Sequence, residues 1–190
     1  MRALPEIQVD SRAALHGWLA DHHAEPGAVW LIRWKKPHPG WFSYDDLVEE
    51  LLCWGWIDSQ PRKIDDDRSA NMIAPRNPRS AWSAVNKRRV EEARAKGLMQ
   101  PSGEAAVAAA QANGQWGVLD QVETLDLPPD LDQALADPVA RATFDAFPKW
   151  LRRACLEWLA TAKTAPTRAA RIAEIADSAA QGLRPKPFRR

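Results

Sequence analysis

Two stretches of the sequence concentrate polar side chains that could bind an anion. In residues 58–63, the alternation of side chains along an extended chain would place Asp58 and Arg62 on one face. In residues 76–86, arginines on a proline-stiffened loop come just before the start of a helix. Backbone N–H groups at a helix N-terminus favour negative charge and add to the effect of guanidinium groups. The two stretches together predict an anion-binding pocket.

Each side chain of this predicted pocket has a role. Arg62, Arg76 and Arg79 would donate charge-assisted hydrogen bonds to the ligand. Asp58 would orient one of these arginines, and Trp82 would form an apolar wall. The predicted ligand-binding residues are Asp58, Arg62, Arg76, Arg79, Trp82, Ser83 and Asn86. The alternative is a solvated loop whose serines only cap the following helix.

Motifs for other chemistries are missing from the sequence. No two histidines stand four residues apart with a carboxylate between them, and no glycine-rich phosphate loop is present. We therefore expect no metal and no cofactor. Asp58 beside arginines could act as an acid or base, but no second carboxylate or nucleophile stands at a spacing that indicates a catalytic pair. The sequence favours binding over catalysis and leaves an enzyme of unknown reaction as an alternative.

The charge of the chain is close to neutral but unevenly distributed. The formal net charge is +1, yet ten Lys and Arg stand against five Asp and Glu in residues 62–96, and ten against three in residues 149–190. An anionic small molecule or an acidic protein segment is the expected partner. Nucleic-acid binding through the basic faces is an alternative, although no nucleic-acid-binding signature is present and the total charge is small.

The cysteines and the apolar segments indicate a cellular compartment. Cys53 and Cys155 lie in apolar helical patterns without a second cysteine nearby, so we expect both to be buried, reduced thiols. No apolar run reaches the roughly 18 residues of a membrane span. The first ten residues contain no apolar signal-peptide segment. These features predict a cytoplasmic protein.

The pattern of apolar residues predicts an α+β fold, with a small antiparallel sheet packed with helices and an all-helical C-terminal part. The predicted strands cover residues 28–34, 56–64 and 69–75, and the predicted helices cover residues 11–22, 43–54, 83–97, 101–114, 150–162 and 166–181. Ten tryptophans are distributed along the chain, and we expect most of them in the core and some in a ligand groove.

The predicted domain boundaries follow from the change in predicted secondary structure along the chain. Residues 1–124 form the predicted α+β domain, residues 125–182 a helical subdomain, and residues 183–190 a basic tail. The last helix carries an apolar stripe with Ile172 and Ile175, so Lys163, Arg168 and Arg171 should form a second, exposed basic face.

Two groups of positions match the motifs of one known family. The first group runs from the predicted strand at residues 56–64 to the fourth predicted helix: Gly55 to Ser59, Arg62, Pro75, Arg76, Pro78, Ser80, Trp82, Ser83, Asn86, Gly97, Met99 and Gly103. The second group lies in the last helices: Ala162, Lys163, Thr167, Arg168, Arg171 and Ile172. These motifs resemble the YdeI/OmpD-associated family, whose members are also labelled bacteriocin-protection proteins. The resemblance implies a stress- or bacteriocin-protection role and transfers no catalytic residue.

Overall fold

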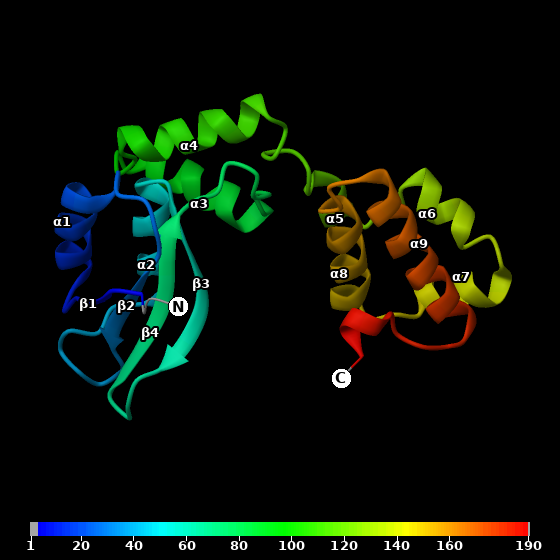
Figure 1. Cartoon of the computed structure of the whole chain (residues 1–190), viewed down its shortest axis with the longest axis horizontal. Helices are drawn as coiled ribbons and strands as arrows, with labels where there is room; N and C mark the ends of the chain where they lie inside the picture. The colour runs from blue at the N-terminus through cyan, green and yellow to red at the C-terminus, as the bar shows by residue number, and fades with distance from the viewer. Residues whose placement is uncertain (1–3, 190) are drawn as a thin grey trace. The chain divides into compact units, whose positions relative to one another are not determined.

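A four-stranded mixed sheet is the centre of the N-terminal part of the chain (Figure 1). The computed structural model describes residues 4–189, and their contacts define an N-terminal unit, up to Trp116, and a C-terminal unit, from Gly117. The sheet has the order β1–β2–β4–β3, with β1 at Glu6–Gln8, β2 at Val29–Trp34, β3 at Trp56–Lys63 and β4 at Arg68–Pro75. The α+β class is confirmed.

Pairing within the sheet follows the predicted hairpin and adds one strand. β3 and β4 pair antiparallel, as predicted, and β4 also pairs antiparallel with β2. The added strand is β1, which pairs with β2 in parallel and makes the sheet mixed rather than purely antiparallel. β1 has three residues, which is too short for an alternating pattern to reveal it.

Local capping explains where the first helices begin. The helices of the N-terminal unit are α1 (Arg12–His22), α2 (Tyr44–Cys53), α3 (Ala84–Ala95) and α4 (Pro101–Ala112). Ser11 accepts a hydrogen bond from the backbone N–H of Ala14, and Ser43 forms a capping box with Asp46. Gly55 follows α2 with a φ of +74°, a conformation that glycine adopts without strain and that turns the chain into β3.

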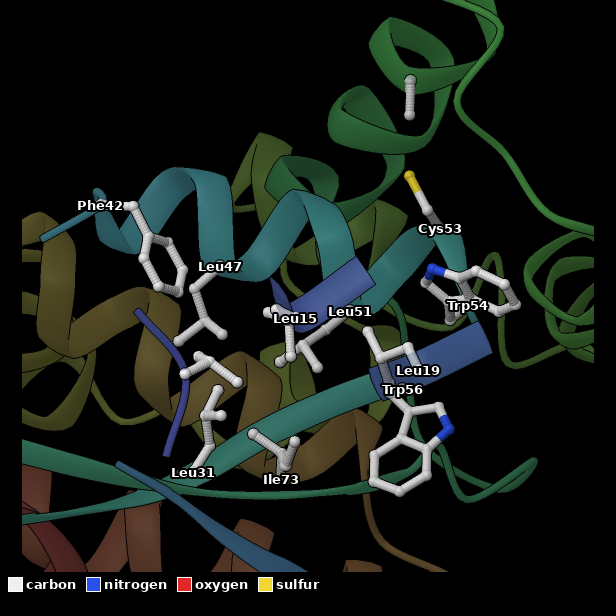
Figure 2. Packing of buried hydrophobic residues seen from close by; sticks show 12 residues of the cluster. Leu15, Leu19, Leu31, Phe42, Leu47, Leu51, Cys53, Trp54, Trp56 and Ile73 are labelled. Atoms are coloured by element: carbon white, nitrogen blue, oxygen red, sulfur yellow. The ribbon is translucent and has the colours of Figure 1, made fainter. Parts of the chain in front are cut away.

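The core of the N-terminal unit lies between the sheet and its first two helices. Figure 2 shows Leu31 and Ile73 from the strands facing Leu15, Leu47 and Leu51 from α1 and α2. All five side chains are almost fully buried. Because α2 is held on both its sheet side and its α3 side, its N-terminal residues are fixed relative to β3.

The C-terminal unit is helical, as the sequence predicts. Its elements are α5 (Asp120–Thr124), α6 (Pro129–Ala134), α7 (Pro138–Asp145), α8 (Lys149–Ala160), α9 (Ala165–Ala180) and the short 3₁₀ helix η1 (Lys186–Phe188). α9 packs against α6, α7 and α8, and its Ile175 and Ala179 are fully buried. Within residues 4–189, no helix combines the length and the apolar character that crossing a membrane requires.

Candidate functional site

A cavity of about 130 Å³ lies between α2, β3 and α3 of the N-terminal unit. Its polar lining residues are Tyr44 from α2, Asp58 from β3, and Asn86 and Arg89 from α3. Apolar residues form the rest of its wall, namely Val48, Leu51, Leu52, Trp56 and Ile57. Polar groups from three separate elements therefore converge on one small apolar-walled space.

Asp58 is held in place by a chain of hydrogen bonds that begins inside the protein. The Tyr44 hydroxyl donates to Asp58 Oδ2 at 2.8 Å, and Asn71 Nδ2 approaches the same oxygen at 3.4 Å. Behind them, Arg33 donates from Nη2 to Asn71 Oδ1 at 3.1 Å and from Nη1 to the Phe42 carbonyl at 3.3 Å. Arg33 and Asn71 are both buried, so the carboxylate rests on a rigid polar support.

The protonation of this network follows from burial. Burial, together with the hydrogen bond to Asp58, raises the pKa of Tyr44 to about 12, so its phenol stays protonated and donates to the carboxylate. Burial also lowers the pKa of Arg33, against the opposing effect of the nearby Asp58 charge. The arrangement thus holds a carboxylate acceptor at the cavity, with a neutral hydroxyl beside it.

The α3 residues of the cavity supply hydrogen-bond donors, whereas Asp58 supplies an acceptor. Asn86 and Arg89 are three residues apart and so share one face of the helix. Arg89 forms an ion pair with Asp45 at the start of α2, on the outer side of the cavity. Ser83 is the N-cap of α3, where its hydroxyl accepts from the backbone N–H of Asn86 at 3.2 Å. Ser83 thus positions Asn86.

Arg76 and Trp82 form a stacked pair next to this cavity. The Arg76 guanidinium lies 3.8 Å from the centre of the Trp82 ring. Arg76 Nη2 donates to the Ala81 carbonyl at 2.6 Å, whereas Nε and Nη1 are buried without a partner among the described residues. Trp82 packs in one cluster with Val48 and Leu52, two residues that line the cavity.

The burial of Arg76 corrects part of the sequence interpretation. Arg76 is only 7% exposed rather than lying on a solvated loop, and burial lowers its pKa to about 10. Asp58, which the sequence suggests as an orienting partner for an arginine, is hydrogen-bonded to Tyr44 and Asn71 instead. The Ala81 carbonyl and the Trp82 ring hold the Arg76 guanidinium.

Arg62 lies on the opposite face of the sheet from Asp58, which is a second correction. The register between β3 and β4 shifts between Asp58 and Pro61, so a bulge interrupts the alternation of faces. Arg62 pairs with Glu6 at 2.5 Å and lies 4.2 Å from the centre of the Trp30 ring. Arg62 therefore belongs to the Trp30 face of the sheet and not to the cavity.

Arg79 is also separate from the cavity lining. It is exposed in the turn before α3, where its backbone N–H donates to Asn77 Oδ1 at 2.9 Å. The structure thus brings Asp58 and Asn86 together, places Arg76 and Trp82 behind the wall, and leaves Arg62 and Arg79 elsewhere.

Sequence reasoning missed Tyr44, Arg33, Asn71 and Arg89 as members of the site. One signal was available: Arg33 shares a strand face with Val29 and Leu31 in an otherwise apolar segment. A charge on an apolar strand face must find a polar partner when it is buried, which indicates an internal polar network. Tyr44 and Arg89 carry no such signal, because only the packing of α2 and α3 brings them to β3.

The arginines of the second basic group hold helices of the C-terminal unit together. Arg168 binds both oxygens of Asp130, at 2.6 and 2.8 Å, and donates to the Leu159 carbonyl at 3.2 Å. Arg171 donates to the Trp158 carbonyl. These carbonyls belong to the last turn of α8, whose backbone acceptors have no partner within the helix. Lys163 is exposed.

Comparisons with known sequences match each unit to a different family. The fold defines an α+β protein with an added helical unit. The family described as a domain of unknown function (DUF8412) matches residues 7–106, just over half of the chain, and the chain belongs to this family. The family described as Bacteriocin-protection, YdeI or OmpD-Associated matches residues 124–182, which confirms the resemblance. The motif positions from Gly55 to Gly103 lie within the first match. No curated protein and no solved structure matches the chain significantly.

Proposed function

We propose that the N-terminal unit binds a small polar molecule with an anionic group in the cavity at Asp58, and that it does so without catalysing a reaction. The observation that supports this proposal is the convergence of Tyr44, Asp58, Asn86 and Arg89 on one cavity. Asn86 and the Arg89 nitrogen atoms that Asp45 does not bind offer hydrogen-bond donors to an acidic group, and Asp58 accepts from a hydroxyl or ammonium group of the same ligand.

The size of the cavity limits the ligand. Its volume of about 130 Å³ is well below the roughly 300–1,000 Å³ of pockets for drug-sized molecules. A ligand of a few non-hydrogen atoms fits this space, whereas a nucleotide does not. An acidic protein segment gains little from the neighbouring surface between α2 and α3, because its arginines and its lysine already pair with Asp45, Glu49 and Glu92.

The protonation states favour binding over catalysis. Tyr44 is held protonated, so it acts as a donor and not as a base. Burial raises the pKa of Cys53 and Cys155 to about 12, which keeps both thiols from acting as nucleophiles at neutral pH. Two buried, unpaired thiols also suit a reducing compartment such as the cytoplasm.

The bacteriocin-protection description of the second family supports a protective role for the whole chain. In this proposal the N-terminal unit senses or sequesters the small molecule. The C-terminal unit supplies the segment that matches the bacteriocin-protection family. The nucleic-acid alternative has less support, because Arg168 and Arg171 already bind Asp130 and helix carbonyls.

Calorimetric titration with three small probes tests the proposal. Glycine carries an anionic and a cationic group, whereas acetate and methylammonium carry one each. We expect glycine to bind more tightly than either single-charge probe, because Arg89 and Asp58 are then both used. Arg89→Gln should weaken glycine binding about tenfold or more, since it removes a charge-assisted contact.

Arg88→Gln is the matched control, because Arg88 is the exposed neighbour of Arg89 and pairs with Glu92 along the helix. This variant loses the same charge and should leave glycine binding unchanged. Equal weakening by the two substitutions, or equal binding of the three probes, would contradict a site at Asp58.

A further inference from the structure

A second, larger cavity of the N-terminal unit lies between the end of α1 and the start of β2. Its volume is about 370 Å³. The lining residues are mostly aromatic, aliphatic or proline side chains: Leu4, Pro5, Trp18, Glu25, Pro26, Gly27, Ala28, Val29 and Trp56. This space is almost three times as large as the cavity at Asp58, and it differs from it in chemistry.

Two tryptophan rings form a corner of this second cavity. Trp18 and Trp56 meet at an angle of 86°, with ring centres 5.6 Å apart. Contacts with two histidines hold these rings in place. His22 stacks on Trp18 with ring centres 4.7 Å apart, and Trp56 Nε1 donates to the His23 carbonyl at 3.0 Å. Trp56 is only 1% exposed, so the partly buried Trp18 supplies the aromatic surface of the cavity, and an indole ring attracts a cation because its face carries negative charge density.

The charge at this cavity also favours a positively charged ligand. Among the lining residues within 4–189, Glu25 is the one that is ionisable, and its side chain is exposed. Among the described residues, no ion pair of Glu25 is present. An unneutralised carboxylate beside aromatic rings favours a positively charged ligand and disfavours an anion. Trp56 also lines the cavity at Asp58, so one residue separates two sites of different charge preference.

We propose that this second cavity binds an organic cation of the methylated-ammonium class. A tryptophan face with a nearby carboxylate attracts a quaternary ammonium group, which loses its weak hydration readily and contacts the ring. The aliphatic and proline walls would contact the methyl groups, and Glu25 would balance the charge. A compact primary ammonium is more strongly hydrated and gains less from the same walls.

A pair of isosteric probes tests this proposal by calorimetric titration. Choline and 3,3-dimethylbutan-1-ol have the same shape, but only choline is charged. Choline should bind at least about tenfold more tightly than the alcohol, because only a cation gains from the Trp18 ring and from Glu25. Equal affinity of the two probes would reduce the site to an apolar cleft, and no binding of choline would remove the site altogether.

Three variants assign the binding to named residues. Glu25→Gln should weaken choline binding about three- to tenfold and leave the alcohol unaffected, whereas Asp21→Asn, a nearby exposed carboxylate outside the cavity, should change neither. Trp18→Leu keeps apolar bulk without a π face, so it should lose most choline affinity and keep the alcohol. Unchanged choline affinity in both Glu25→Gln and Trp18→Leu would overturn the proposal.

Discussion

Two motif arginines, Arg168 in the C-terminal unit and Arg76 in the N-terminal unit, have opposite roles. In the C-terminal unit, Arg168 uses Nε, Nη1 and Nη2 for hydrogen bonds to Asp130 and to a helix carbonyl. In the N-terminal unit, Arg76 is more deeply buried, makes one hydrogen bond and stacks on Trp82. The first arginine holds three helices together, α6, α8 and α9, whereas the second leaves two buried nitrogen atoms without a partner among the described residues.

The difference teaches that a basic residue in a motif is not by itself a binding residue. A guanidinium whose donors are used by the protein stabilises the fold and has little left for a ligand. A buried guanidinium without a carboxylate costs free energy that packing must offset. The two arginines therefore should respond to substitution in opposite ways.

The largest expected effect is the protection of the two thiols, which report on the units separately. Cys53 is buried in the N-terminal unit and Cys155 in the C-terminal unit, and burial raises both pKa values to about 12. We expect a bulky thiol reagent to label each cysteine about a thousandfold or more slowly in the native protein than in urea, since labelling requires unfolding. Rapid labelling of one cysteine would show that its unit opens independently.

The second-largest expected effect is the loss of stability when the Arg168 contacts are removed. Arg168→Met should lower the free energy of unfolding of the C-terminal unit by about 1–2 kcal/mol, because it removes charge-assisted hydrogen bonds that are half-exposed. Urea denaturation followed by Cys155 labelling measures this change. Arg153→Met, which removes a single exposed contact with Glu123, is the control and should cost less than about 0.5 kcal/mol. Equal losses of unfolding free energy in the two variants would mean that the Arg168–Asp130 contact stabilises the unit no more than an ordinary exposed ion pair.

Acid should weaken the same unit through Asp130. The hydrogen bonds from Arg168 lower the pKa of Asp130 below its ordinary value of 3.8. The folded state therefore holds the ionised carboxylate more favourably than the unfolded state, and this stabilisation is present above pH 3.8 and lost as the pH falls through the folded pKa. Asp130→Asn should flatten the acid limb of stability against pH, measured by denaturation at several pH values. A limb with unchanged slope would assign the acid sensitivity to other carboxylates.

The smallest expected effect is that of Arg76→Met. Methionine is shorter than arginine but apolar and flexible, so it packs against Trp82 and removes a buried charge that lacks a carboxylate partner, and stability should stay within about 1 kcal/mol of the native value or rise. Cys53 labelling in urea measures the change. A loss of more than about 2 kcal/mol would show that the guanidinium supports the loop before α3, and the contrast with Arg168 would then disappear.

The sequence by itself determined the features that depend on residues close together in the chain. Three helices begin where the sequence predicts, and Ser11, Ser43 and Ser83 cap them, because each hydroxyl accepts from a backbone N–H three residues later. The β3–β4 hairpin follows from two extended segments joined by the short acidic turn at residues 64–67. Burial of Cys53 and Cys155 follows from their positions in apolar helical stripes.

Only the tertiary structure decided where the polar residues of the candidate site lie. A register shift between Asp58 and Pro61 moves Arg62 to the other face of the sheet, and one extra residue in a strand leaves no clear mark in sequence. Arg168 pairs with Asp130, which is 38 residues away, because α6 and α9 pack together. The physical reason is common to these cases: the partner of a charged side chain is chosen by packing between distant elements, whereas caps and turns are chosen by near neighbours.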